Sequence, residues 1–196
     1  SACWTGLRVG LLGGSFNPPH PGHVHISHIA LQSLKLDAVW WLVSPHNPLK
    51  DKSDLASFDE RMAMCRDITR HEPRIVVTDI ERDLGTNQSY YTLKAIVDGF
   101  PKTDFVWLTG MDNALTMHQW HRWQDLLKTI ATAHIARPPA LTLIENCPLK
   151  MRHQQNHVFL EKAGKVPLKP GYTYWLMQKK MVDISSTDLR KSDKNQ

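Results

Sequence analysis

The stretch LRVGLLGGSFNPPHPGH, from Leu7 to His23, joins an apolar run to a loop rich in glycine, proline and histidine. The apolar run Leu7–Gly13 predicts a buried β-strand, and from His23 apolar residues recur at helical spacing as far as Lys35. A strand, a glycine-containing loop and a helix therefore follow one another directly. Backbone amides and the positive end of a helix dipole favour an anion at such a junction. The loop is thus a candidate binding site as well as a turn.

Apolar runs and helical periodicity continue to alternate along the chain. Further strands are predicted at Ala38–Ser44, Arg74–Ile80, Asp104–Gly110, Thr132–Pro138 and Tyr172–Gln178. Further helices are predicted at Phe58–Thr69, Tyr91–Val97, Asn113–Met117, Trp123–Lys128 and Ser185–Lys191. This alternation indicates an α/β fold, a mostly parallel twisted sheet with helices on both faces. Ligands of such sheets bind at the carboxyl ends of strands near a switch in strand order, which is where the loop is expected.

The composition limits the class of protein. With 196 residues and 41% apolar content, we expect a single domain spanning residues 1–196. Three isolated cysteines without metal-ligand spacing indicate a reducing, cytoplasmic compartment, and no run approaches the ~18 apolar residues of a membrane span. The net charge of +5 is modest for a nucleic-acid binder. Solvated surface explains the basic residues gathered between positions 179 and 194 best, and a small polyanion explains them at least as well as nucleic acid. We therefore expect neither nucleic acid nor a membrane as a partner.

The loop after the first strand carries residue types suited to phosphate. Gly13 and Gly14 lack a Cβ, so the backbone can turn sharply and a phosphate can approach the amide groups. His20 and His23 can each donate an N–H to a phosphate oxygen, more strongly if protonated. The loop matches neither G-x-G-x-x-G nor G-x-x-x-x-G-K-[ST]. Two other interpretations stay open, a histidine metal site and an ordinary proline-rich turn.

A second candidate phosphate-binding segment is ISSTDLR, residues 184–190. Ser185, Ser186 and Thr187 offer hydroxyls at an expected helix start, where they can cap the helix or bind an anion. Arg190 follows one turn later as a fork-shaped donor to phosphate. Alone, such a segment is more often a helix cap than a site. Its pairing with the loop at the other end of the chain makes the phosphate interpretation more specific.

Together the two segments resemble the nucleotidyltransferase superfamily marked by [HT]-x-G-H and [IV]-S-S-T-x-x-R, and within it the bacterial nicotinate-nucleotide adenylyltransferases. The resemblance covers most of the chain and is carried by GLLGGSFNPPHPGH, WWLVSPHNPLK, VTDIERDLGTNQSYYTL, FVWLTGMDNALTMHQWHRWQDLL, ARPPA and ISSTDLR. It implies a Rossmann-like nucleotidyltransferase fold and transfer of AMP from ATP to nicotinate mononucleotide. Mg²⁺ carried by the ATP phosphates is the implied cofactor, and a homodimer is the expectation taken from relatives.

The resemblance also implies roles for individual residues. The catalytic residues are His20, His23 and Arg190, which would stabilise the transition state rather than act as acid or base. The ATP-binding residues are Gly13, Gly14, Ser15, Phe16, Gly22, Gly110, Asp112, Ser185, Ser186 and Thr187. The substrate-binding residues are Ser89, Lys50 and Trp120, whose ring would stack on the pyridine. Packing of a helix on the sheet is the alternative role for Trp120.

Two departures from the family pattern concern the pyridine pocket. QSYYTL stands where relatives have Y-T-x-D-T-L, with Gln88 for the tyrosine and Tyr91 for the aspartate, and NPLK stands for P-P-H-K, with Leu49 for the histidine. A nicotinamide-mononucleotide or dual-specificity enzyme is an alternative, because the neutral amide asks little different of a pocket, and phosphopantetheine adenylyltransferase is a weaker one. A nucleotide-binding regulatory module without turnover is a third. The presence of all three expected catalytic residues favours an enzyme.

Overall fold

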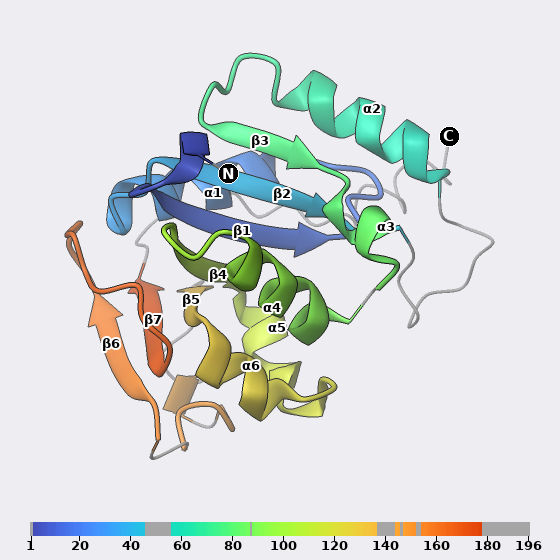
Figure 1. Ribbon diagram of the computed structural model, residues 1–196. Helices are drawn as coiled ribbons and strands as arrows, with labels where there is room; N and C mark the ends of the chain where they lie inside the picture. Colours follow the sequence, from blue (N-terminus) through green and yellow to red (C-terminus); the bar gives the residue numbers. More distant parts are fainter. Residues whose placement is uncertain are drawn as a thin grey trace, which may run out of the picture.

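The computed structural model of the chain describes residues 2–45, 56–86, 88–136, 144–145, 147–151 and 154–177. Within these residues, seven strands form one sheet in the order β3-β2-β1-β4-β5-β7-β6, and every neighbouring pair is parallel (Figure 1). The strands are β1 (Arg8–Gly14), β2 (Ala38–Val43), β3 (Ile75–Thr78), β4 (Asp104–Gly110), β5 (Ala131–Ala136), β6 (Asn156–Leu160) and β7 (Tyr172–Met177). The predicted α/β fold with a mostly parallel sheet is confirmed.

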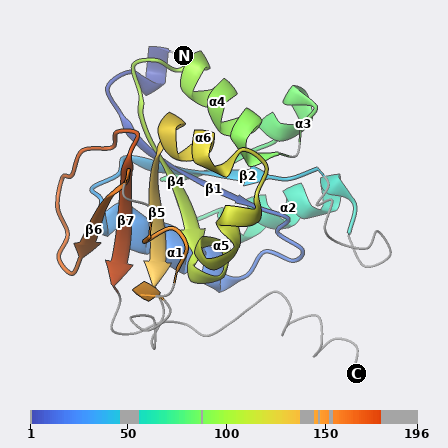
Figure 2. The same ribbon diagram turned by 90° about the horizontal axis from the view of Figure 1, so that it is seen from below.

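Helices cover both faces of this sheet. They are α1 (Pro21–Ser33), α2 (Phe58–Ile68), α3 (Ile80–Leu84), α4 (Ser89–Gly99), α5 (Met111–Thr116) and α6 (Trp123–Thr129), with the 3₁₀ turns η1 (Ala2–Trp4) and η3 (Met117–Gln119). Figure 2 shows α4, α5 and α6 in front of the strands and α1 behind them. Among the described residues, no helix combines the length and the apolar character needed to cross a membrane.

Two apolar layers hold the helices against the sheet, because strand side chains alternate between its faces. In β2, Trp40 and Leu42 join the layer shared with α4 and α6, whereas Trp41 joins the layer shared with α1 and α2. The indole N–H of Trp41 donates to the Ser27 hydroxyl of α1 at 2.9 Å, so this buried polar group is satisfied. All of β2 is buried, as expected for a parallel strand covered on both sides.

Two elements differ from the sequence prediction. The predicted third strand runs to Ile80, but β3 ends at Thr78 and α3 begins at Ile80, ending before Gly85, whose φ of 62° is left-handed. The strand β6 was not predicted, because its five residues form an edge that pairs only with β7 and leaves Phe159 42% exposed. The predicted helix Ser185–Lys191 lies outside the described residues.

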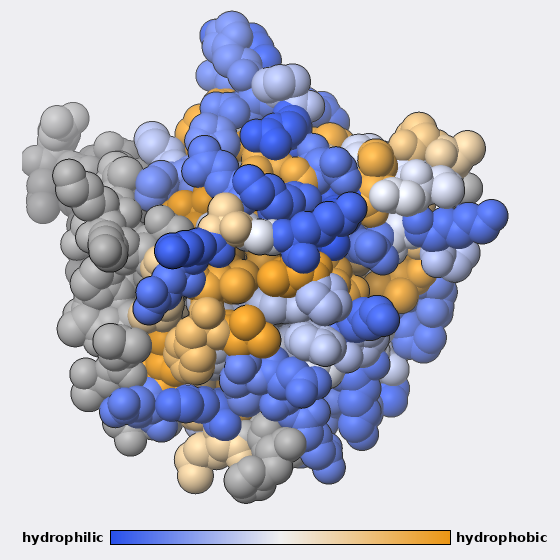
Figure 3. Space-filling view, turned by 90° about the vertical axis from the view of Figure 1, so that its left-hand side faces the viewer, coloured by the Kyte–Doolittle hydropathy of each residue, from blue (hydrophilic) through white to orange (hydrophobic). Residues whose placement is uncertain are grey.

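The β6 edge lies at the left of Figure 1. In the space-filling view of that side, apolar patches lie between hydrophilic side chains (Figure 3). None of the residues of this edge strand is fully buried, unlike those of the central strands. The mixed surface there agrees with the weak sequence signal of β6.

Candidate functional site

A cleft of about 450 Å³ opens beside the carboxyl ends of β1 and β2. Its walls are formed by Gly13, Gly14, Ser15, Ser44, Glu81, Gln88, Ser89, Trp107, Asn113, Thr116, Gln119, Trp120 and His121. The strands β2 and β3 lie on one side of β1, and β4 and the later strands lie on the other, so the strand order switches at β1. Parallel sheets bind ligands at such a switch. The predicted location of the site is therefore matched by a cleft.

The two glycines of the loop are needed for different reasons. A Cβ on Gly13 would lie 2.3 Å from Cη2 of Trp107, whose ring is 4% exposed and forms part of the cleft wall. A Cβ on Gly14 would lie 3.4 Å from the nearest ring atom of Phe16, an ordinary contact. Close packing against Trp107 therefore requires glycine at Gly13, in addition to the phosphate approach expected from the sequence.

His20 and His23 are bonded to each other across the first turn of α1. The backbone N–H of His20 donates to Nδ1 of His23 at 3.2 Å, and the backbone N–H of Gly22 donates to Nδ1 of His20 at 3.1 Å. The two ring centroids are 3.9 Å apart, and His20 is 7% exposed. The His20 ring thus caps the helix, and the His23 ring accepts from the backbone N–H of His20 at the same end of α1.

These bonds fix which ring nitrogen carries the proton. Because Nδ1 accepts a hydrogen bond in both rings, the proton of the neutral form is placed on Nε2. Burial, and then the neighbouring His20 ring, lower the pKa of His23 from 6.5 to about 3. His23 is therefore a neutral Nε2–H donor at neutral pH. The stronger, protonated donor considered from the sequence is not the form that this environment favours.

Phe16 turns out to be a core residue rather than a side chain that lines the cleft. Its ring is 1% exposed, stacks on Trp41 with centroids 4.8 Å apart and lies 4.8 Å from the His23 ring. Its φ of 46° is left-handed, which is unusual for a bulky residue and marks a locally constrained loop. Any role of Phe16 in ATP binding therefore falls to its backbone.

The G-x-D segment follows β4 directly. Gly110 is the N-cap of α5, and Asp112 is exposed in the first turn of this helix. Behind the segment, the Thr109 hydroxyl and Nδ1 of His134 are 2.5 Å apart, and both residues are buried. Burial, and then His157, lower the pKa of His134 to about 3. A neutral, buried histidine on β5 thus anchors the end of β4 from which the segment begins.

Comparison with known proteins identifies the family. The cytidylyltransferase-like family model matches residues 11–192. A relative from Cereibacter sphaeroides that is named a nicotinate-nucleotide adenylyltransferase is 44% identical over 184 residues, which are 94% of this chain and 97% of that protein. The chain belongs to the nicotinate-nucleotide adenylyltransferase family.

Further matches to the nicotinate-nucleotide adenylyltransferase family agree. The relative from Parvibaculum lavamentivorans is 51% identical over 133 residues, 68% of this chain and 66% of that protein, and the relative from Agrobacterium fabrum is 37% identical over 96% of this chain and 100% of its own length. The solved structure of Plasmodium falciparum nicotinic acid mononucleotide adenylyltransferase complexed with NaAD has a TM-score of 0.71 at 19% identity, covering 94% of this chain and 83% of that one. The fold is shared, and the protein is a nucleotidyltransferase, as predicted.

The structure brings together only part of the residue set expected for a nicotinate-nucleotide adenylyltransferase. Five predicted residues line the cleft: Gly13, Gly14, Ser15, Ser89 and Trp120. Five others lie beside it, in the loop, at the start of α1 and at the start of α5, but are not part of the described walls: Phe16, His20, Gly22, His23 and Gly110. Asp112 is likewise outside these walls. Lys50, Ser185, Ser186, Thr187 and Arg190 lie outside the described residues.

Trp120 packs against the core and also lines the cleft. It follows η3, is half-buried and packs against the apolar layer of α4 and α6, while part of its side chain lines the cleft. Ser89 begins α4 on the same cleft, next to Gln88. The hydroxyl of Tyr91 lies 3.5 Å from Nε2 of His121, which also lines the cleft. Of the two departures from the family pattern, Gln88 lines the cleft and Tyr91 contacts a residue that lines it.

Glu81 is a cleft residue that the sequence analysis missed. It lies in α3, is 5% exposed and lines the cleft. Burial raises the pKa of Glu81, and a hydrogen bond with the Ser44 side chain partly offsets this effect. The predicted strand Arg74–Ile80 ends one residue before Glu81, so the sequence prediction assigns Glu81 to no element, whereas the structure places it in α3. A carboxyl group thus faces the same space as the phosphate loop.

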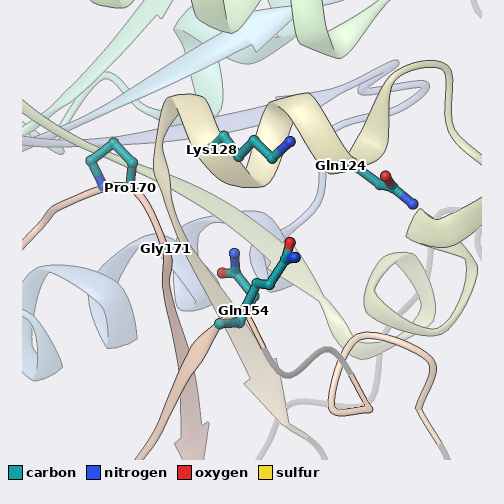
Figure 4. Close-up of a pocket in the computed structure, with 6 residues that line it drawn as sticks. Gln124, Lys128, Gln154, Pro170 and Gly171 are labelled. Atoms are coloured by element: carbon teal, nitrogen blue, oxygen red, sulfur yellow. The ribbon is translucent and has the colours of Figure 1, made fainter.

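Two further observations concern the remainder of the described chain. A hollow of about 230 Å³ lies before the amino ends of β6 and β7, where Gln124, Lys128, Gln154, Gln155, Pro170 and Gly171 line it (Figure 4). This is the opposite end of the strands from the cleft, and none of the predicted site residues lines it.

Within the described residues, no group of three or more His, Cys, Asp and Glu side chains is placed to hold a metal ion.

Proposed function

We propose that the protein transfers AMP from ATP to nicotinate mononucleotide, which gives nicotinate adenine dinucleotide and pyrophosphate. The observation that carries the proposal is the 44% identity, over 94% of the chain, with a relative named for this activity. The cleft beside the loop between β1 and α1 supplies a place for the two substrates. The shared fold of the Plasmodium falciparum enzyme supports the same assignment.

The chemistry asks for positioning and charge stabilisation. The 5′-phosphate of the acceptor attacks the α-phosphorus of ATP, so a new P–O bond forms there. The bond from this phosphorus to the oxygen that bridges it to the β-phosphate breaks, and pyrophosphate leaves with the electron pair. The acceptor phosphate has a second pKa near ~6 and is already anionic at neutral pH, so no general base is needed. The enzyme must hold two polyanions in line and stabilise charge on the leaving group.

Each part of the phosphate machinery has a proposed task. Gly13 and Gly14 admit the phosphates to the backbone amides of the loop, and His20 and the neutral His23 donate Nε2–H groups to phosphate oxygens. The late segment 184–190, with Arg190, binds the β- and γ-phosphates. Mg²⁺ arrives with ATP as part of that substrate and offsets the charge of the phosphates.

The acceptor side rests on aromatic stacking and hydrogen-bond donors. Trp120 offers a ring face for the pyridine, and Ser89 offers a hydroxyl to the same cleft. Lys50 is proposed to meet the acidic acceptor. Nicotinamide mononucleotide is the second candidate acceptor, because Gln88 and Tyr91 depart from the family pattern at this end of the cleft.

The deciding experiment measures pyrophosphate release from ATP and Mg²⁺ with three acceptors in parallel: nicotinate mononucleotide, nicotinamide mononucleotide and phosphopantetheine. We expect the highest kcat/KM with nicotinate mononucleotide, and the dinucleotide as its product by mass spectrometry. A higher kcat/KM with either other acceptor would overturn the named substrate. Binding of ATP without turnover of any acceptor would favour a regulatory module.

We also propose that the enzyme works in the cytoplasm as a homodimer. The compartment is supported by the free thiols of exposed Cys3 and of buried Cys65 and Cys147. The dimer rests only on what is expected of the family. Light scattering on the purified protein tests it: twice the mass of 22.5 kDa is expected, and a single chain mass would contradict the dimer.

A further inference from the structure

Arg61 is a fully buried cation next to the cleft. It lies in α2 and is 0% exposed. Its Nη1 donates to the carbonyl oxygens of Ser15 at 2.6 Å and Ser44 at 2.7 Å, its Nη2 donates to Pro45 O at 3.1 Å, and its Nε donates to Ala56 O at 3.1 Å. Burial lowers the pKa of Arg61, and no carboxylate of the described residues is paired with it. A buried charge is costly, and the four carbonyl groups offset part of this cost. The position of such a cation beside the cleft therefore requires an explanation.

The four carbonyl groups belong to three segments that meet at the cleft. Ser15 lies in the loop after β1, Ser44 and Pro45 follow β2, and Ala56 precedes α2. Ser15 and Ser44 both line the cleft. The loop after β1 and the segment after β2 are also bonded directly, because the backbone N–H of Ser44 donates to the carbonyl oxygen of Gly14 at 3.0 Å. One guanidinium therefore sets the spacing of the loop relative to the end of β2.

The contact with Ser15 also determines the direction of a peptide group. In a trans peptide the N–H points opposite to the C=O. Because the Ser15 carbonyl points to Arg61, the N–H of the same peptide, which belongs to Phe16, points away from Arg61. Phe16 has a left-handed backbone, which is strained for a bulky residue and persists only where the surrounding structure holds it. Arg61 on one side and the Trp41 stack on the other hold it.

We propose that Arg61 is a positioning residue for the triphosphate of ATP: it holds the peptide groups at Gly14–Phe16 in the orientation that binds the phosphates. The ligand named here rests on the proposed function. Arginine suits this task because its planar fork donates in several fixed directions at once. A lysine would keep the charge but concentrate its donors at one point, so it could not bond all four carbonyls in the same geometry.

Arg8 provides a matched control, because it is another buried arginine that bonds backbone carbonyl groups. It is 7% exposed, and its guanidinium also donates to backbone carbonyls: Lys35 O at 3.2 Å, Leu34 O at 2.9 Å and Val166 O at 2.8 Å. Arg8 begins β1, whereas the cleft lies beyond the end of β1. The two arginines therefore share burial and partner type and differ in their distance from the phosphate loop.

The test compares Arg61→Lys with Arg8→Lys. Arg61→Met removes all four hydrogen bonds and can unfold the protein, so the lysine variants carry the experiment. Melting temperatures are recorded first, and calorimetry with a non-hydrolysable ATP analogue and Mg²⁺ follows at a temperature where both variants are folded. We expect lower melting temperatures for both. Only Arg61→Lys is expected to weaken analogue binding, by about tenfold or more, and to lower kcat by up to ~10²-fold.

Two results would overturn the inference: analogue binding by Arg61→Lys within twofold of the wild type, or an equal loss of binding in Arg8→Lys. The second result would mean that any buried arginine acts through stability alone. Calorimetry needs no acceptor, so an unexpected acceptor in the turnover assay leaves this test intact. A wild-type protein that binds no ATP analogue would instead contradict the proposed function itself.

Discussion

His20 and His23 form a reciprocal pair in which each Nδ1 accepts a backbone N–H at the start of α1, at 3.1 and 3.2 Å. The same hydrogen bonds that cap the helix orient both rings and assign their protons to Nε2. The pair thus links local helix stability to the chemistry of the loop. The neutral His23 ring held in this way can donate to phosphate without a change of its own protonation during turnover.

Replacing His23 separates these two contributions. We expect His23→Ala to lower kcat by ~10²–10³-fold, the usual cost of losing a donor to developing charge. Loss of the acceptor for the His20 N–H is expected to lower the melting temperature only modestly. His28→Ala is the control, because His28 lies in the same helix and is bonded to Glu72 at 2.7 Å instead. Near-normal turnover of folded His23→Ala would refute the role of His23.

The lowered pKa values predict how stability depends on pH. The pKa of both His23 and His134 is about 3 in the folded protein, against 6.5 as the ordinary value. Between these values the unfolded chain binds protons that the folded chain does not, so the free energy of unfolding falls as the pH is lowered from 6.5 towards 3. Each such histidine contributes a slope of up to ~1.4 kcal/mol per pH unit.

Urea unfolding of the wild type and of His134→Gln between pH 7 and pH 4 measures this slope. The variant should lose less stability on acidification, because one buried imidazole no longer has to stay neutral. NMR of the ring protons of His23 provides a second measurement, and we expect constant chemical shifts from pH 5 to pH 8. A titration of His23 with a midpoint near its ordinary value would show that its ring is not held neutral.

The location of the site could be predicted from the sequence, because a parallel sheet leaves little choice. The apolar run before Gly13 and the helical periodicity after His23 place the loop at the carboxyl end of a central strand. The helical periodicity that begins at His23 also placed this histidine at the start of the helix. These signals are local, since each depends on residues that are close together in the chain.

The residues that other elements bring to the cleft could not be predicted in this way. Trp107 lies on β4 opposite Leu11 of β1, and only this register puts its ring against Gly13. Glu81 depends on where β3 ends and α3 begins. Arg61 stands beside Met62 in an apparently ordinary amphipathic helix, and only the packed structure shows its buried carbonyl partners. No spacing along the chain encodes such contacts.

The different surroundings of Gly13 and Gly14 predict different effects of alanine. Gly13→Ala places a Cβ against the rigid ring of Trp107 and should lower the free energy of unfolding by ~1–3 kcal/mol, as overpacking does. Gly14→Ala meets only an ordinary contact and should unfold at nearly the wild-type urea concentration. Urea unfolding followed by tryptophan fluorescence measures both. Equal destabilisation by the two substitutions would contradict the role assigned to Trp107.

The buried carboxyl group of Glu81 should affect the pH dependence of stability in the opposite direction to the exposed carboxyl group of Glu60. Burial raises the pKa of Glu81, so the folded protein holds its proton more tightly than the unfolded chain. The stability that this group contributes is complete below its unfolded pKa of 4.5 and is lost as the pH rises through the folded value. Glu81→Gln removes the ionisation, so it should be stabilising relative to the wild type at pH 8 and less so at pH 4.

Glu60→Gln is the control, because hydrogen bonds from Ser57 lower the pKa of exposed Glu60. The stability that Glu60 contributes is present above its unfolded pKa and lost as the pH falls, so its replacement should be more harmful at pH 8 than at pH 4. Melting temperatures of both variants at the two pH values measure the contrast. If Glu81→Gln follows the same direction as Glu60→Gln, the Glu81 carboxylate is stabilised in the cleft and burial does not dominate its ionisation.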